Sequence, residues 1–190
     1  MDRNSHVLRW TAAAVRIAYI LTIVGCVGFL VAVVVAAAYP GFGGNGSGSF
    51  VVDGGAVRID LSSGVDQSTA RSGIIISFGV GFLTALVALA ILASLRRLLT
   101  NVAAGKPFSL DNAGLIRRIG ILVIAAGALG SLAGYAMWRH FSGQIAVAGV
   151  TLQPKLALPV EETLLGLIII CLSEVFRYGA GLQEEHDLTV

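Results

Sequence analysis

Residues 17–39 read IAYILTIVGCVGFLVAVVVAAAY and contain no charged side chain. Crossing about 30 Å of hydrocarbon takes roughly 20 apolar residues of helix. The run also exceeds the roughly 7–15 apolar residues of a secretory signal, although Arg3, Arg9 and Arg16 precede it as basic residues precede such a signal. The stretch therefore predicts a retained transmembrane helix and not a cleaved leader.

The composition of the whole chain points the same way. Of 190 residues, 56% are hydrophobic and 13% are charged, whereas soluble domains contain about 25% charged residues. This number of charges is too small to cover the surface of a soluble protein. The expected class is therefore an integral membrane protein whose surroundings are the lipid bilayer. The net charge of +2 gives no indication of direct nucleic-acid binding.

Three more apolar runs complete the pattern. Residues 72–95 and 119–138 contain no charge, and a shorter run at 163–173 has charged residues near both ends. The sequence therefore predicts an all-α transmembrane fold, a four-helix membrane bundle forming one domain over residues 1–190. The expected spans are about 14–39, 72–99, 112–139 and 159–182, with outer loops at 40–71 and 140–158 and a cytoplasmic connection, here called the elbow, at 100–111.

Lysine and arginine in short loops predict the orientation, because they accumulate on the cytoplasmic side. With the N-terminus inside, the inner set is larger than the outer set, so both termini and the elbow are expected in the cytoplasm. The inner set is Arg3, Arg9, Arg16, Arg96, Arg97, Lys106, Arg117, Arg118 and Arg177, and the outer set is Arg58, Arg71, Arg139 and Lys155.

Each outer loop contains a pattern typical of a short β-hairpin. Asp53-Gly54-Gly55 separates two strand-like segments, 50–52 and 56–59, and Ala148-Gly149 separates 144–147 from 150–152. Asp-Gly and Gly-Gly pairs favour tight hairpin turns. The prediction is a pair of short extracytoplasmic β-hairpins, with the further hypothesis that they form one small sheet, since a lone hairpin is marginal in water.

The elbow is the most sharply patterned segment of the chain. Gly105 can end the second helix, Pro107 prevents its continuation, and Ser109 can cap the next helix with Asp111 in its first turn. Phe108, just before the cap, can pack on the following turn as a hydrophobic staple. An ordinary helix–loop–helix connection explains every one of these residue types without a ligand.

Two stretches resemble a known family. LRRLLTNVAAGKPFSLDNAGLIRRIG at 95–120 and SEVFRYGAGLQEEHDLTV at 173–190 are similar to the signatures of the YoaS-like bacterial family of four-span membrane proteins of unknown function. The resemblance implies a multi-pass protein of the bacterial inner membrane with no established reaction. It also implies a candidate partner, a small helix-turn-helix transcription regulator, because genes of this type often neighbour one.

Glu174 is the most informative single residue, because an ionisable group within a span is costly and is a functional candidate by default. Arg177 follows on the same helical face. The pair fits two descriptions: an interfacial ion pair that fixes packing, or a polar hub that couples the bundle to an acidic tail. The residues expected to bind a partner or to couple it to the bundle are Arg96, Arg97, Lys106, Pro107, Phe108, Ser109, Arg117, Arg118, Glu174, Arg177, Glu184 and Glu185.

Catalytic motifs are missing from the sequence. There is no nucleophile–base constellation and no phosphate loop, since Gly105-Lys106-Pro107 lacks the other elements of a Walker motif. Cys26 and Cys171 have no partners at metal-ligand spacing. The chain is thus expected to be no enzyme and to need neither cofactor nor metal, with a role as a signalling sensor or as a membrane anchor for a cytoplasmic regulator. The alternative is a small transporter or permeability protein with Glu174 in its path, and a second copy of the chain is a further candidate partner.

Small residues lie on one side of the helix predicted for the third apolar run. Gly130 and Gly134 form a small-xxx-small pattern, with Gly127 nearby. Such patterns let membrane helices approach closely. We expect these glycines to pack the third span inside the bundle.

Overall fold

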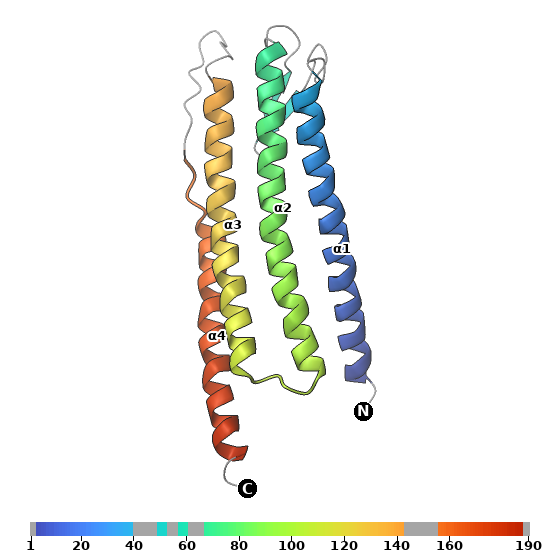
Figure 1. Ribbon diagram of the computed structural model, residues 1–190. Helices are drawn as coiled ribbons and strands as arrows, with labels where there is room; N and C mark the ends of the chain where they lie inside the picture. Colours follow the sequence, from blue (N-terminus) through green and yellow to red (C-terminus); the bar gives the residue numbers. More distant parts are fainter. Residues whose placement is uncertain (1–2, 40–48, 53–56, 61–66, 143–155, 188–190) are drawn as a thin grey trace. The chain divides into compact units, whose positions relative to one another are not determined.

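Four long helices make up most of the chain (Figure 1). A computed structural model describes residues 3–39, 49–52, 57–60, 67–142 and 156–187. The helices are α1 Arg3–Ala38, α2 Gln67–Ala103, α3 Leu110–Ser142 and α4 Val160–Asp187. Each contains a segment long and apolar enough to cross a membrane: Trp10–Ala38, Ser72–Ala103, Leu110–His140 and Val160–Gln183. The expectation of an all-helical chain with four such helices is confirmed.

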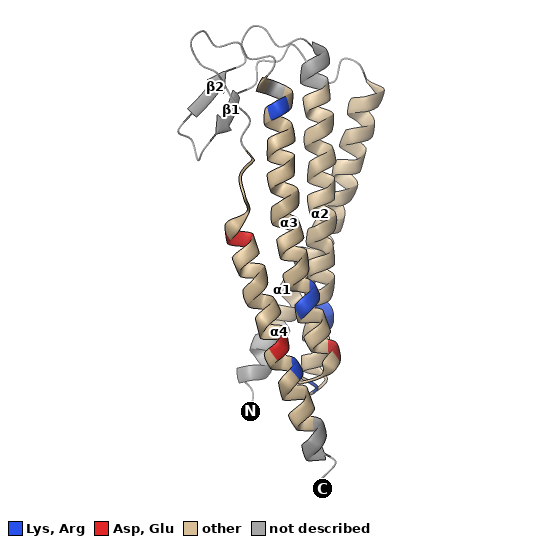
Figure 2. Ribbon diagram, turned by 90° about the vertical axis from the view of Figure 1, so that its left-hand side faces the viewer, with Lys and Arg blue, Asp and Glu red and all other residues tan. Residues whose placement is uncertain are grey.

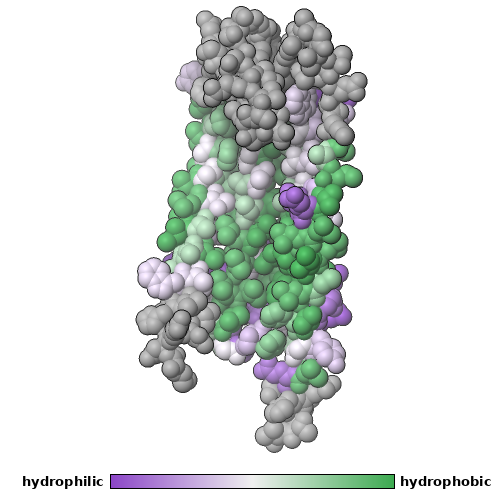
Figure 3. Space-filling model, turned by 180° about the vertical axis from the view of Figure 1, so that it is seen from behind, coloured by the Kyte–Doolittle hydropathy of each residue, from purple (hydrophilic) through white to green (hydrophobic). Residues whose placement is uncertain are grey.

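The surface of these helices is largely apolar. Hydrophobic residues cover most of the helical surface visible in Figure 3, and large side chains such as Ile168, 65% exposed, and Leu132, 59% exposed, point outward. Contiguous apolar surface on this scale is rare on soluble proteins. The helices therefore fit a hydrocarbon environment better than water.

Two short strands lie between α1 and α2. β1 Ser49–Val52 and β2 Val57–Asp60 pair antiparallel, with Ser49 opposite Asp60 and Val52 opposite Val57. A pair of four-residue strands is marginal by itself, so it does not change the all-helical class. The turn at 53–56 and the second expected hairpin, at 144–152, lie outside the described residues. Extracytoplasmic hairpins that join into one sheet stay a prediction.

The chain divides into two compact units. Unit 1 comprises Met1–Cys26, Leu83–Ser131 and Leu158–Val190, and unit 2 comprises Val27–Phe82 and Leu132–Ala157. Unit 1 thus holds the first part of α1, the later part of α2, the first part of α3, all of α4 and the elbow. Within unit 1, the first residues of α1, the elbow and the C-terminal end of α4 lie at the same end (Figure 1).

In unit 1, α3 and α4 approach each other through glycines. A Cβ added at Gly120 would lie 2.8 Å from the carbonyl oxygen of Gly166, and one at Gly166 would lie 2.7 Å from that of Gly120. A Cβ at Gly127 would lie 2.6 Å from Glu162 Cβ. Only residues without a side chain allow such a backbone approach.

These contacts correct the expected glycine motif. A Cβ added at Gly130 or Gly134 would meet nothing within 4 Å, so the small-xxx-small pair does not mark the close packing of α3. The close packing of α3 on α4 is instead at Gly120 and Gly127 of α3 and at Gly166 of α4. The pattern failed because the partner helix decides which small residues face it.

Unit 2 contains a close contact between α1 and α2. A Cβ added at Gly81 would lie 2.6 Å from Phe29 Cε1, and the rings of Phe29 and Phe78 lie 6.2 Å apart. Ser72 Oγ and His140 Nε2 also share a hydrogen bond of 2.9 Å between α2 and α3. These contacts help to hold unit 2 together through aromatic packing and a polar pair between α2 and α3.

Candidate functional site

The elbow begins with a fully formed helix stop. Gly105 adopts a φ of +78°, its N–H donates to Val102 O at 3.0 Å, and the Lys106 N–H donates to Asn101 O at 3.1 Å. This pair of bonds is a Schellman motif, which satisfies carbonyl groups that the end of a helix would otherwise leave unpaired. The sequence expectation that Gly105 ends α2 therefore agrees with the geometry.

The helix that follows begins at the expected cap. Ser109 Oγ accepts from the backbone N–H of Asn112 at 3.2 Å, and Ser109 O accepts from the Ala113 N–H at 3.1 Å. Ser109 is thus the N-cap of α3, and Asp111 lies in the first turn, where a carboxylate favours the positive end of the helix dipole.

Asn112 joins both ends of the elbow. Its side chain is 0% exposed. Its Nδ2 donates to Lys106 O at 2.8 Å and to Pro107 O at 3.0 Å, and its Oδ1 accepts from Asn101 Nδ2 at 2.7 Å. The last turn of α2, the loop and the first turn of α3 are therefore held in one arrangement.

Phe108 fastens the elbow to α4. Its ring lies 5.5 Å from that of Phe176, and a Cβ added at Gly179 would lie 3.2 Å from Phe108 Cδ1. The sequence placed Phe108 against the following turn of its own helix. The contacts in the structure run instead to a helix about 70 positions further along the chain, which local pattern cannot reveal.

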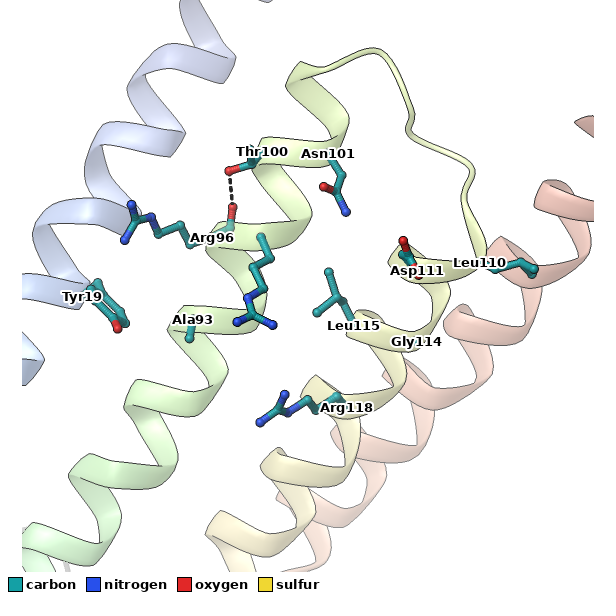
Figure 4. Close-up of a pocket in the computed structure, with 11 residues that line it drawn as sticks. Tyr19, Ala93, Arg96, Thr100, Asn101, Leu110, Asp111, Gly114, Leu115 and Arg118 are labelled. Carbon is teal, nitrogen blue, oxygen red and sulfur yellow. Dashed lines mark hydrogen bonds between the residues drawn. The ribbon is translucent and has the colours of Figure 1, made fainter.

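A pocket of about 820 Å³ lies beside the elbow, between α2 and α3 (Figure 4). Its charged lining consists of Arg96, Arg97, Arg118 and Asp111, and Tyr19 of α1 also reaches it. In Figure 4 the Arg118 side chain extends from α3 toward α2, and the Arg96 side chain extends toward α1. The pocket is therefore lined by three arginines and one aspartate.

The arginines of this region differ in their partners. The Arg96 guanidinium lies 5.8 Å from the centre of the Tyr19 ring, within the range of a cation–π contact. Among the described residues, Arg97, Arg117 and Arg118 form no ion pair. Arg117 is next to Arg118 in the chain but does not line the pocket.

Glu174 and Arg177 form an exposed pair on α4. Arg177 Nη2 lies 2.8 Å from Glu174 Oε2, and the two side chains are 64% and 47% exposed respectively. The pair neutralises itself, and none of the arginines of α3 is bridged to Glu174. A hollow of about 600 Å³ beside the pair is lined by α4 residues, among them Tyr178 and Leu182.

The first turn of α4 lies midway along α3. Glu162 and Pro159 are the neighbours of Gly127, and Glu161 and Glu162 lie in the first turn of α4, at the end of the fourth span that is expected to face outward. Gly127 allows the first turn of α4 to pack at this point of α3, because a side chain at position 127 would clash with Glu162. Glu162 is thus placed beside the interior of the uncharged run of α3.

Several predicted partner-binding residues do come together around the elbow. Lys106 is exposed, and Pro107, Phe108 and Ser109 form the loop and cap already described. The side chains of Glu184 and Glu185 lie outside the described part of the structure. Among the residues that are described, no group of three His, Cys, Asp or Glu side chains is placed to hold a metal ion.

Sequence reasoning missed Asn101, Asn112 and Tyr19. A signal for the two asparagines was present, since each lies within a turn of a predicted helix end where amides often bond to backbone. Nothing in the sequence indicated that they bond to each other, or that Tyr19 lies beside the pocket.

The fold and the site define the class of protein. Four helices that are long and apolar enough to cross a membrane are the features of a multi-pass membrane protein. Residues 8–190 match the family described as "Protein of unknown function (DUF2975)", and the chain belongs to that family. No match was found among curated proteins or among solved structures. None of these comparisons supports the narrower YoaS-like assignment.

Proposed function

We propose that the protein is a non-enzymatic protein of the bacterial inner membrane that acts as a sensor or as a membrane anchor for a cytoplasmic regulator. The elbow and the end of α4 form its docking face. The regulator is a small helix-turn-helix transcription regulator, the partner that the sequence resemblance implies.

The distribution of charge supports the orientation that this role requires. The lysine and arginine residues of unit 1 gather toward the elbow end of its helices (Figure 2). The start of α1 and the end of α4 lie at that same end. Because basic residues favour the cytoplasmic side, this end of unit 1 is expected in the cytoplasm, with both termini.

The observation that carries the proposal is the ordered construction of the elbow. A connection between two membrane helices needs only to be soluble, yet here a buried asparagine makes three side-chain hydrogen bonds and Phe108 packs on α4. Lys106 remains exposed on this frame, as does Arg117. A backbone held in one arrangement is suited to recognising a partner, because little backbone conformational entropy is lost on binding.

The acidic tail is the second part of the docking face. Residues 183–190, QEEHDLTV, contain Glu184, Glu185 and Asp187 next to a basic end of the molecule. Residues 183–187 continue α4 as a helix, and we expect their carboxylates to contact the regulator through charge complementarity.

The test is a cross-linking pull-down from native membranes that compares the intact protein with a version lacking residues 183–190. A variant with Lys106→Gln and Arg117→Gln tests the elbow, and Arg139→Gln is a control that removes one cation from the last turn of α3. The proposal expects a small DNA-binding protein with the intact chain and the control, and much less with the other two. Recovery of lipid and the protein alone from every sample would contradict it.

A second function, a small transporter, is favoured by the position of Glu162. An acidic side chain beside the middle of an uncharged run is costly in lipid, and such residues often mark ion pathways. Glu162→Gln and Glu174→Gln in liposomes test this candidate. Loss of ion or proton flux in either variant would favour transport over anchoring. Absence of flux with the unmodified protein would rule out the transporter function.

A further inference from the structure

The pocket between α2 and α3 carries an unbalanced positive charge. Three of its lining residues, Arg96, Arg97 and Arg118, are cationic, and Asp111 is the opposing carboxylate. Among the described residues, no carboxylate pairs with Arg97 or Arg118. Cations gathered in a hollow attract anions more strongly than the same charges spread over a flat surface.

The pocket lies at a definite level of the helices. Arg96 and Arg97 directly follow the uncharged run 72–95, and Arg118 directly precedes the run 119–138. From Arg96, α2 continues to Ala103, about 10 Å at 1.5 Å per residue. If the uncharged runs cross the hydrocarbon, the arginines are at its edge, in the layer of the lipid headgroups.

The chemistry of the lining fits a phosphate group. A guanidinium offers a planar set of donors that matches two phosphate oxygens at once. Gly114 lines the pocket without a side chain, and a Cβ added there would meet nothing within 4 Å, so space for a ligand remains. A volume of about 820 Å³ lies within the range of small-molecule pockets, roughly 300–1,000 Å³.

We propose that this pocket binds the phosphate headgroup of an anionic phospholipid, with Arg97 and Arg118 as its principal ligands. Arg96, held beside Tyr19, adds to the positive potential, and Asp111 limits how much negative charge the pocket accepts. This inference goes beyond the proposed function, because it needs no regulator and can fail or succeed independently of it.

The test measures how many lipids the purified full-length protein retains in a neutral detergent, by native mass spectrometry with phosphatidylglycerol and phosphatidylcholine in competition. The matched pair of variants is Arg118→Gln, which alters the pocket, and Arg117→Gln, which removes the same charge from the adjacent position outside it. Each arginine near anionic lipid contributes about 1 kcal/mol, which is about fivefold in affinity. We expect about fivefold weaker phosphatidylglycerol binding in Arg118→Gln, a further fivefold with Arg97→Gln, and less than twofold in Arg117→Gln.

A steric variant separates the pocket from its charge. Gly114→Leu places a side chain in the hollow, removes no charge and meets no neighbouring atoms of the protein at its Cβ, so the fold should persist while lipid binding falls. Equal loss of phosphatidylglycerol binding in Arg117→Gln and Arg118→Gln, or unchanged binding in Gly114→Leu, would show that the pocket is not the binding site. Equal retention of phosphatidylcholine, or binding of glycerol 3-phosphate as tightly as the diacyl lipid, would overturn the anionic lipid as its ligand.

Discussion

Asn101 Nδ2 donates a hydrogen bond to Asn112 Oδ1 at 2.7 Å, and this bond joins the last turn of α2 to the first turn of α3. The two residues are 11 positions apart, on opposite sides of a proline-containing loop. Asn112 also holds two carbonyl groups of that loop. The elbow is consequently one hydrogen-bonded unit and not a flexible linker between two helices.

Replacing Asn112 by alanine should destabilise the protein strongly. The change leaves Lys106 O, Pro107 O and Asn101 Nδ2 without their partner in bonds that are part-buried, and an unpaired polar group costs roughly 1–3 kcal/mol when it is buried. We expect a loss of about 3 kcal/mol in the free energy of unfolding, measured by denaturation in detergent micelles. Asp111→Ala, at the exposed neighbouring position, is the control and should cost under about 1 kcal/mol. Equal stability of the two variants would contradict this account of the elbow.

Two glycine-to-alanine substitutions should have opposite signs. Gly105→Ala puts a side chain on a residue with a φ of +78°, which costs about 1–2 kcal/mol. Gly114→Ala changes an exposed residue of α3 with no atom within 4 Å of the new Cβ, and it should gain up to about 1 kcal/mol through helix propensity. Thermal unfolding of both variants checks the pair, and a stabilising Gly105→Ala would show that the Schellman motif does not form.

The packing of α3 on α4 predicts a steric test. In Gly166→Ala the new Cβ would clash with Ile124 Cγ1 and lie 2.7 Å from Gly120 O, and a forced separation of packed helices typically costs about 1–3 kcal/mol. Gly130→Ala meets nothing and should be neutral or slightly stabilising. If Gly130→Ala proved the more damaging variant, α4 would have to pack on a different face of α3.

Glu174→Gln should leave stability almost unchanged. The ion pair with Arg177 is about half exposed, and pairs of this kind contribute about 0–1 kcal/mol. The melting temperature in micelles at low and high salt measures the effect. A loss well above 1 kcal/mol would mean that other parts of the protein or a second copy enclose the pair.

Local chemistry allowed the elbow to be predicted, but not what it contacts. The backbone preferences of Gly105, Pro107 and Ser109 act within a few residues, so they predicted where α2 ends and where α3 begins. The structure agrees with both predictions. Phe108 packs on Phe176 and Asn112 bonds to Asn101, and both contacts depend on how separate helices come together.

The same distinction explains the glycines and α4. The sequence shows that Gly127, Gly130 and Gly134 are small, but only the partner helix decides that Gly127 is approached and the others are not. Apolar length predicts a fourth spanning helix. It does not predict that Glu162 lies beside the middle of α3, because hydropathy contains no information on the relative level of two helices.

Site-specific photo-cross-linking in living cells tests the anchor proposal most directly. A photoreactive residue at Lys106, exposed on the elbow, is compared with one at Ala136, exposed on the apolar part of α3. The account predicts an adduct with one small cytoplasmic DNA-binding protein at position 106 and none at position 136. The absence of any protein adduct at position 106, or the same adducts at both positions, would contradict it.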